Sequence, residues 1–232
     1  MAATNTPSSE PGITAEAATP STGSIHFETF ASADGTKMEY AIALPDNFDS
    51  QKEYPILLAL PPGGQGKDLV QALLDRYWAE GINRGWVVLS PAAPGGVLFF
   101  SGSERLIPEF LAETARTYKP EGGQYHLAGI SNGGLSAFRI IGNNPELFKS
   151  LLVLPGFPQT EADQQKLSSL VNIPVAMFVG GEDTGWLEAM QDTEKTLTQL
   201  GGKVTLKVLP GEGHILESLT AGELFDLLES FR

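Results

Sequence analysis

The sequence predicts an α/β domain in which a mostly parallel, twisted sheet is covered by helices on both faces. Short, continuously apolar runs alternate with longer segments of helical periodicity along most of the chain. Such runs are typical of strands buried on both faces, and their alternation with helices favours parallel connections. A length of 232 residues without internal repeats suits one domain with a sizeable core. We therefore expect a single domain over residues 24–232.

The first two strands are predicted to form an antiparallel hairpin at the N-terminal side of this domain. Residues 24–32 and 36–44 are both rich in β-forming side chains, and Asp34-Gly35 between them is a favourable hairpin turn. A polar connection over residues 45–53 leads from the hairpin into the alternating part of the chain.

The remaining strands and helices are predicted from their periodicity, in chain order. Apolar strands are expected at residues 54–60, 86–89, 125–129, 151–154, 175–179 and 204–209. Helices are expected at residues 69–84, 103–118, 132–142, 162–170, 186–200 and 215–231. Asp68 and Ser103 are expected to cap the first two of these helices, because short polar side chains satisfy free N–H groups at a helix start.

Composition excludes several classes of function. A formal net charge of −13 argues against nucleic acid or an anionic membrane as a partner, because phosphate contacts need clustered Lys and Arg. The absence of cysteine removes disulfides, thiolate metal sites and a cysteine nucleophile. The three histidines, His26, His126 and His214, fit no metal-binding spacing. We expect no metal, no cofactor and no membrane span.

A serine between glycines marks the centre of the candidate site. An apolar strand ends at Gly129, a helix opens at Asn132, and Ser131 lies in the turn between them. This Gly-x-Ser-x-Gly pattern is typical of a nucleophile elbow, in which the serine has a strained backbone and a raised hydroxyl. At Gly129 and Gly133 a β-carbon would collide with the neighbouring strand or helix. The alternative is that Ser131 is only a helix N-cap.

Two further polar residues follow predicted strands in the same way as Ser131. Asp183 comes after the strand at 175–179, and His214 after the strand at 204–209. Reactive groups in open α/β sheets gather beyond the carboxyl ends of the strands. A serine hydroxyl needs an imidazole to take its proton, and the imidazole needs a carboxylate to orient it. Glu182 competes with Asp183 as the acid, and His214 has the alternative of being a surface loop histidine.

With these residues in place, the chain resembles the serine esterases of the α/β-hydrolase superfamily. The resemblance covers about residues 25–232 and is greatest to the small bacterial feruloyl esterase-like and polyhydroxybutyrate depolymerase-like esterases. It rests on Gly63-Gly64, Gly129-Ile-Ser-Asn-Gly133, Gly181-Glu-Asp183 and Gly211-Glu-Gly-His214. It implies the α/β-hydrolase fold, and a carboxylesterase whose catalytic triad has Ser131 as nucleophile, Asp183 as acid and His214 as base. The implied reaction cleaves small-molecule or polymer-linked carboxylic esters through an acyl-enzyme.

The oxyanion hole departs from the pattern of this family. Where the family usually has His-Gly, this chain has Pro61-Pro62, and proline has no N–H to donate. The N–H of Asn132 is expected as the first donor, since it lies at a helix N-terminus. The second donor is expected from Gly63, with Gly64 as the alternative.

The substrate-binding residues are expected near these donors. Gly64 and Trp186 are assigned to this role, although Trp186 has the alternative of simply beginning a helix. Leu98, Phe99 and Phe100 are expected to form an acyl or aryl pocket, with burial under the following helix as the alternative.

The surroundings of the site are also predicted from the sequence. Only about twenty residues separate the strands at 151–154 and 175–179, so we expect no sizeable cap domain and an open site. Glu182, Glu188 and Asp192 near the acid loop should disfavour strongly anionic substrates.

Residues 1–23 are expected to form a disordered leader. They are mostly Ala, Thr, Ser, Pro, Glu and Gly, and cannot bury enough apolar surface to offset the entropy of ordering. The segment lacks the basic start and apolar core of a signal peptide. It also resembles what remains when an export signal is trimmed, so a secreted or periplasmic location is one expectation and a cytoplasmic location the other.

Two other functions stay open at the level of sequence. A peptidase of the same fold would need a pocket for a peptide terminus, which no sequence feature supplies. A catalytically idle binding protein is favoured by Pro61-Pro62 and opposed by the intact Ser, Asp and His positions.

Overall fold

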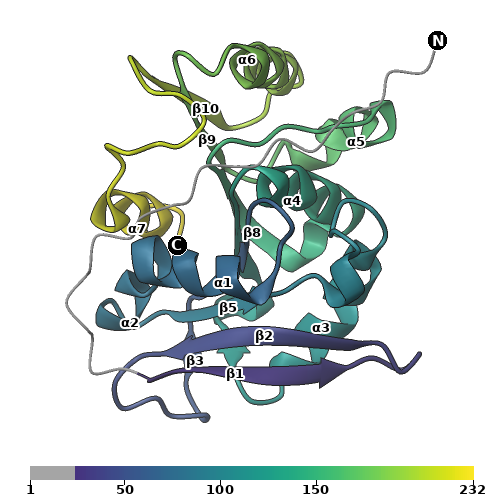
Figure 1. Ribbon diagram of the computed structural model, residues 1–232, viewed down its shortest axis with the longest axis vertical. Helices are drawn as coiled ribbons and strands as arrows, with labels where there is room; N and C mark the ends of the chain where they lie inside the picture. The colour runs from purple at the N-terminus through teal and green to yellow at the C-terminus, as the bar shows by residue number, and fades with distance from the viewer. Residues whose placement is uncertain (1–23) are drawn as a thin grey trace.

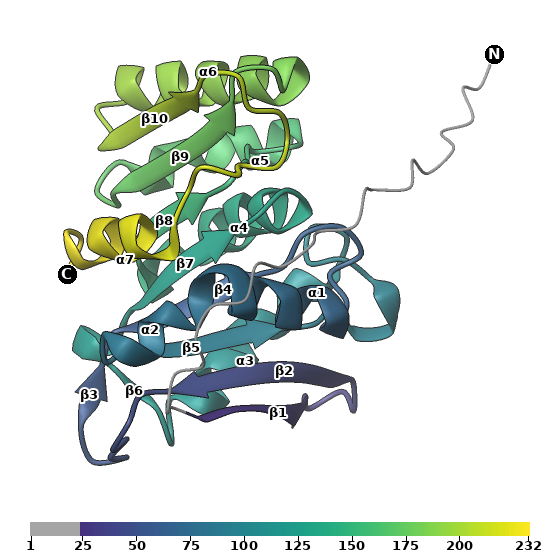
Figure 2. The same cartoon turned by 60° about the vertical axis from the view of Figure 1, so that its left-hand side comes forward.

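The computed structural model describes residues 24–232, and the leader predicted for residues 1–23 lies outside the described residues. The described chain forms a mixed eight-stranded sheet, which runs in Figure 2 from β1 at the bottom to β10 at the top. In sheet order the strands are β1 (Ser24–Ala31), β2 (Lys37–Leu44), β5 (Val87–Pro91), β4 (Ile56–Leu60), β7 (Tyr125–Gly129), β8 (Phe148–Val153), β9 (Val175–Gly180) and β10 (Val204–Leu209).

The pairing within the sheet confirms the predicted fold class. β1 and β2 form the antiparallel hairpin, and β2 pairs antiparallel with β5. All other neighbours in the sheet are parallel. The carboxyl ends of β4, β7, β9 and β10 therefore share one edge, and the loops that leave this edge carry the candidate site.

Helices cover both faces of the sheet (Figure 1). One face is covered by α1 (Lys67–Leu73), the π-helical turn η1 (Leu74–Trp78), α2 (Glu80–Asn83) and α7 (Ala221–Glu229). The other is covered by α3 (Ile107–Thr114), α4 (Asn132–Asn143), η6 (Lys166–Leu170) and α6 (Thr184–Gln199). Short elements complete the described chain: β3 (Glu53–Tyr54), η2 (Pro94–Gly96), η3 (Ser103–Leu106), β6 (Lys119–Pro120), η4 (Glu121–Gly123), η5 (Pro145–Leu147) and α5 (Glu161–Gln165).

Alternating side chains of each central strand fill two separate cores. In β4, Ile56, Leu58 and Leu60 pack into the core below α3 and α4. Leu57 and Ala59 of the same strand pack into the core below α1 and α7. Because successive side chains of a strand point to opposite faces, a strand covered on both sides must be apolar throughout.

Several predicted helix boundaries were wrong. The first helix starts at Lys67 after Gly66, so Asp68 lies in its first turn and does not cap it. Ser103 likewise lies inside the turn η3, after Gly102. The helix predicted at 215–231 starts only at Ala221, where the Thr220 hydroxyl caps the N–H of Glu223.

His126 is a buried titratable side chain inside the central strand β7. Its Nδ1 lies 2.7 Å from Ser150 Oγ, and the Trp86 ring packs edge-on against it with 4.8 Å between the ring centroids. Burial in this apolar surrounding, with smaller contributions from Lys149 and Arg232, lowers the pKa of His126 to about 4. The imidazole is therefore neutral in the folded protein at neutral pH.

This shift predicts a loss of stability in mild acid. An unfolded histidine takes up a proton near pH 6.5, whereas folded His126 does so only near pH 4. The unfolded state then binds more protons between these values, so the free energy of unfolding falls as the pH drops through this window, by about 2–4 kcal/mol. Urea titrations of wild type and His126→Gln should show a shallower fall in the variant. Equal slopes would contradict the prediction.

Candidate active site

The turn between β7 and α4 has the backbone geometry of a nucleophile elbow. Ser131 has φ 53° and ψ −118°, a conformation that is unfavourable for any residue with a β-carbon. Its hydroxyl makes no capping bond to α4, which argues against the plain N-cap alternative. Ser131 is 6% exposed, and its hydroxyl faces the hollow beyond the sheet edge.

The glycines on either side allow the backbones to approach this closely. A β-carbon on Gly129 would lie 2.1 Å from the carbonyl oxygen of Gly133. A β-carbon on Gly133 would lie 2.2 Å from the carbonyl oxygen of Leu60 at the end of β4. Both separations are far inside van der Waals contact with rigid backbone, so the predicted collision is confirmed.

Gly133→Ala should therefore destabilise the protein severely. The new methyl group has to push α4 away from β4, which we expect to cost about 3 kcal/mol or more. Gly185→Ala is the matched control, because a β-carbon on Gly185 in α6 would have nothing within 4 Å and would raise helix propensity by about 0.5–1 kcal/mol. Thermal unfolding should show a lower midpoint for the first variant and an equal or higher one for the second. The reverse order would contradict this account.

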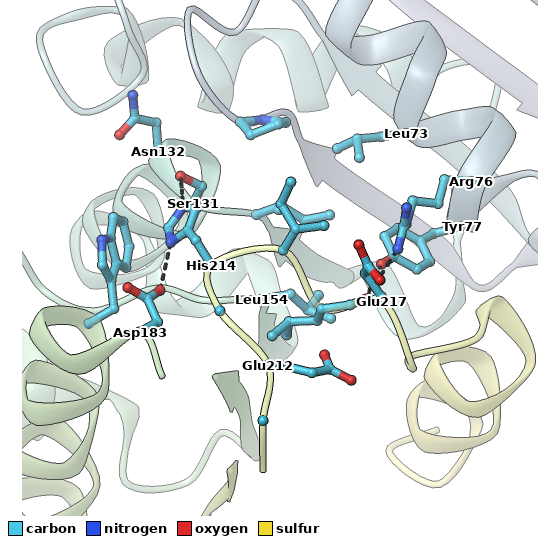
Figure 3. Close-up of a pocket in the computed structure, with 17 residues that line it drawn as sticks. Leu73, Arg76, Tyr77, Ser131, Asn132, Leu154, Asp183, Glu212, His214 and Glu217 are labelled. Carbon is cyan, nitrogen blue, oxygen red and sulfur yellow. Dashed lines mark hydrogen bonds and ion pairs between the residues drawn. The ribbon is translucent and has the colours of Figure 1, made fainter. Parts of the chain in front are cut away.

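The structure brings Ser131, His214 and Asp183 together from three separate loops (Figure 3). His214 Nε2 lies 2.8 Å from Ser131 Oγ, and His214 Nδ1 lies 2.6 Å from Asp183 Oδ2. The Asp183 side chain is 14% exposed and that of His214 35% exposed. The carboxylate thus fixes the imidazole with Nδ1 as donor and leaves Nε2 to accept a proton from the hydroxyl.

The acid loop and the histidine loop are joined directly by backbone contacts. The N–H of Glu182 donates to the carbonyl of Glu212 at 2.8 Å, and the N–H of Gly181 donates to that of Leu209 at 2.8 Å. A β-carbon on Gly180 would lie 2.0 Å from the carbonyl oxygen of Gly213. Gly180 therefore permits the contact that sets Asp183 against His214, a role that the sequence pattern alone did not indicate.

Trp186 packs against the imidazole from the side of α6. Its ring centroid lies 4.8 Å from that of His214, with the two planes at 61°. Phe157 supports the indole from behind in an edge-on contact at 5.0 Å. Trp186 is the third residue of α6 and also lines the cavity. It therefore both begins a helix, as one alternative had it, and lies where a substrate-binding residue was expected.

The two backbone N–H groups predicted to hold the oxyanion are both without a partner in the described chain. Within residues 24–232, neither the N–H of Gly63 nor that of Asn132 donates a hydrogen bond. Gly63 has φ 53°, and its carbonyl accepts a bond of 2.9 Å from Asn132 Nδ2. Neither glycine is among the residues that line the cavity, but Gly64 is exposed, whereas Gly63 is half-buried and is bonded to Asn132. Gly63 is therefore the better placed of the two candidate donors.

A cavity of about 800 Å³ opens beside Ser131. Its walls are mainly apolar and come from α1, the elbow and the segment after His214, with Leu73, Ile130, Leu154, Ile215 and Leu216 among the lining residues. The side opposite Ser131 carries Arg76 and Tyr77, which both donate to the carbonyl of Leu216, at 3.2 and 3.1 Å (Figure 3). These two residues were not among the predicted site residues.

Neither Phe99 nor Phe100 is among the residues that line this cavity, so the structure does not bring them to the place predicted for them. Phe99 is completely buried in the core between the sheet and α3. The carbonyl of Phe100 accepts a hydrogen bond from Arg139 of α4. The alternative of burial under the following helix is the correct one for Phe99, because its loop turns inward and the Phe99 N–H donates to Gln65.

The described chain contains neither a cluster of metal ligands nor a membrane-spanning helix. Among residues 24–232, no three His, Cys, Asp or Glu side chains are grouped so that they could hold a metal ion. In the same part of the chain no helix has both the length and the apolar character that crossing a membrane would require.

No family model and no curated protein matches the sequence of this chain. Solved structures do match in fold. A thermostable esterase superposes with a TM-score of 0.69 at 20% identity over 80% of this chain. A ferulic acid esterase superposes with a TM-score of 0.63 at 18% identity, over 90% of this chain and 98% of its own. A putative dipeptidyl aminopeptidase IV from Bacteroides ovatus superposes with a TM-score of 0.70 at 13% identity over 90% of this chain.

These similarities concern architecture. The chain spans 54% of the length of the thermostable esterase and 35% of that of the peptidase. The neighbours are hydrolases, mostly esterases, and match this chain in overall fold. The chain therefore has the α/β-hydrolase fold.

Proposed function

We propose that this protein is a serine hydrolase that cleaves carboxylic esters through an acyl-enzyme. The observation that carries the proposal is the hydrogen-bonded chain from Ser131 Oγ to His214 at 2.8 Å and from His214 to Asp183 at 2.6 Å. A hydroxyl in this arrangement can lose its proton to the imidazole as it attacks, and the carboxylate stabilises the resulting imidazolium. The strained elbow at Ser131 supports the same role.

The proposed reaction has two halves. In the first, His214 Nε2 takes the Ser131 proton while Oγ bonds to the ester carbonyl carbon, and the negative oxygen is held by the N–H groups of Gly63 and Asn132. The imidazolium then gives its proton to the departing alcohol, which leaves Ser131 acylated. In the second half, His214 deprotonates a water that attacks the acyl group, and the proton returns to Ser131 as the carboxylic acid departs.

The cavity favours esters with an apolar group next to the reacting carbonyl. Ile130, Leu154 and Leu216 provide apolar surface in the cavity that Ser131 also lines. None of the residues from 155 to 174, between β8 and β9, lines the cavity, so α5 and η6 do not form a lid over it. Such an open site can accept an ester group on a bulky or polymeric substrate.

A peptidase is the second candidate, since one of the fold neighbours carries the name of a dipeptidyl aminopeptidase. An ester panel measured beside peptide p-nitroanilides separates the two. We expect turnover of p-nitrophenyl acetate and butyrate and none of the anilides. Turnover of the anilides at comparable rates would favour the peptidase.

A catalytically idle binding protein is the third candidate, because Pro61-Pro62 replaces the usual His-Gly. Exposure to a fluorophosphonate followed by mass spectrometry tests it, since only an activated serine reacts rapidly with this reagent. We expect one adduct, on Ser131. A protein that stays unlabelled and hydrolyses no ester would be an idle fold.

A further inference from the structure

The loop that carries Gly63 contains one unusual side chain, that of Gln65. The loop covers residues 61–66, between β4 and α1. Gln65 is fully buried although it is polar, and its backbone φ is 54°, in the region that favours glycine. A buried amide and a positive φ are each unfavourable unless the surroundings compensate. The two together indicate that this position has a specific task.

The Gln65 side chain is satisfied by three partners from three different segments. Its Nε2 donates to Ser136 Oγ at 2.9 Å and to the carbonyl of Pro61 at 3.2 Å. Its Oε1 accepts from the N–H of Phe99 at 2.8 Å. A carbonyl can only accept and an N–H can only donate, so these partners fix which way the amide points.

Ser136 connects Gln65 to the elbow helix. Ser136 Oγ donates to the carbonyl of Asn132, one turn earlier on α4, at 2.8 Å. The Asn132 side chain returns to the loop through its 2.9 Å bond to the carbonyl of Gly63. The loop is therefore attached to α4 at two points that closely follow the Gly63 N–H, at the Gly63 carbonyl through Asn132 and at Gln65 through Ser136.

The backbone of Gln65 completes the attachment. Its N–H donates to the carbonyl of Pro62 at 2.9 Å, which closes a tight turn around Gly63 and Gly64. Its carbonyl accepts from the N–H of Ala93 at 2.8 Å, which ties the turn to the segment after β5.

We infer that Gln65 is a positioning residue of the proposed oxyanion hole, holding the Gly63 N–H at a fixed distance from the Asn132 N–H. The inference rests on the proposed function. Pro61 and Pro62 can donate no hydrogen bond, so the first N–H that the loop offers after β4 is that of Gly63. The placement of this N–H depends on the network of Gln65, Ser136 and Asn132. This network acts on the donor and does not touch substrate.

The position of an oxyanion donor affects the transition state much more than the bound ester, because the charge develops only in the transition state. Gln65→Met keeps the length of the side chain and removes its hydrogen bonds. We expect kcat for p-nitrophenyl acetate to fall about 10–100-fold, which is no more than the fall in kcat that removing a whole oxyanion donor causes. KM should stay within about threefold of the wild-type value. The affinity for an alkyl boronic acid, which forms a tetrahedral adduct with a nucleophilic serine, should fall in parallel with kcat.

Ser136→Ala provides a milder variant that keeps the Gln65 side chain. It removes the link to α4 only, and we expect kcat to fall about 3–10-fold with KM retained. Ser90→Ala is the matched control, since the Ser90 hydroxyl is also buried and donates at 2.8 Å to the carbonyl of Ala59 in the neighbouring strand, outside the network of Gln65, Ser136 and Asn132. Its kcat should stay within about twofold of wild type.

The comparison separates the possible outcomes. If the wild type hydrolyses esters, and Ser136→Ala and a folded Gln65→Met both keep the wild-type kcat, the inferred role of Gln65 is wrong and the proposed function stands. The role of Gln65 is also wrong if Ser90→Ala loses as much kcat as Ser136→Ala does. The same holds if the Gln65 and Ser136 variants raise KM and leave kcat unchanged. If Gln65→Met does not fold, Ser136→Ala and the boronic acid decide alone. A wild type that hydrolyses no ester overturns the proposed function and this inference together.

Discussion

Ser131→Ala is expected to reduce kcat for p-nitrophenyl butyrate by about 10⁵–10⁶, essentially to the background rate. The substitution removes the one atom that forms the covalent bond, so neither His214 nor the oxyanion donors can compensate. The fold should survive, because the Ser131 hydroxyl caps no helix and its only hydrogen bond within the described chain is to His214. Circular dichroism and the unfolding midpoint should match those of wild type within a few degrees.

Ser150→Ala is the matched control for this variant. Ser150 is also a buried serine in hydrogen-bond contact with a histidine, since its Oγ lies 2.7 Å from His126 Nδ1. That pair lies inside the sheet and lines no part of the cavity. The control should keep full activity and lose some stability, the opposite of the pattern for Ser131→Ala. Retained hydrolysis in Ser131→Ala would defeat the assignment of the nucleophile.

The strands of this fold could be predicted from the sequence because burial on both faces leaves a plain signal. The runs at β4, β5, β7, β8 and β9 are apolar at nearly every position that meets a helix layer, and all of them were located within a few residues. The elbow was equally clear, since two glycines at fixed spacing from Ser131 are required by contacts of 2.1 and 2.2 Å with backbone atoms.

The cavity could not be predicted in the same way, because it depends on where a helix begins. The apolar residues Ile215, Leu216 and Leu219 suit a helix that continues to residue 231. In the structure the segment stays irregular until Thr220 and Glu223 form a capping box that starts α7. Residues 215–217 thereby become one wall of the cavity. The Thr-x-x-Glu pattern was present in the sequence and would have given this boundary.

Phe99 shows the limit of interpreting an apolar run as a binding surface. Residues 98–100 follow a glycine-rich turn, and both a pocket and a core position fit such a run. The direction is set by the long-range bond between the Phe99 N–H and Gln65 Oε1 at 2.8 Å, which no local pattern reveals. A hydrogen bond between segments 34 residues apart is a property of the folded chain alone.

Asp183→Asn is expected to lower kcat by about 10⁴ while the unfolding midpoint stays close to that of wild type. The amide can still occupy the place of the carboxylate, 2.6 Å from His214 Nδ1, but it no longer stabilises the imidazolium. It can also offer its NH₂ group to Nδ1, which selects the tautomer with the proton on Nε2. That tautomer cannot accept the Ser131 proton, so the attack fails although the geometry is kept.

Glu182→Gln is the control that distinguishes the two neighbouring acids. Glu182 contacts the histidine loop through its backbone N–H, which the substitution leaves in place, and its side chain makes no hydrogen bond to His214 within the described residues. Its kcat should remain within about threefold of wild type, as expected for a charge outside the hydrogen-bonded chain. Asp183 and Glu182 are adjacent and their side chains differ by one methylene. Equal losses of kcat in the two variants would therefore show that the overall negative charge of this loop matters. A large loss in Asp183→Asn alone would assign the orientation of His214 to one carboxylate.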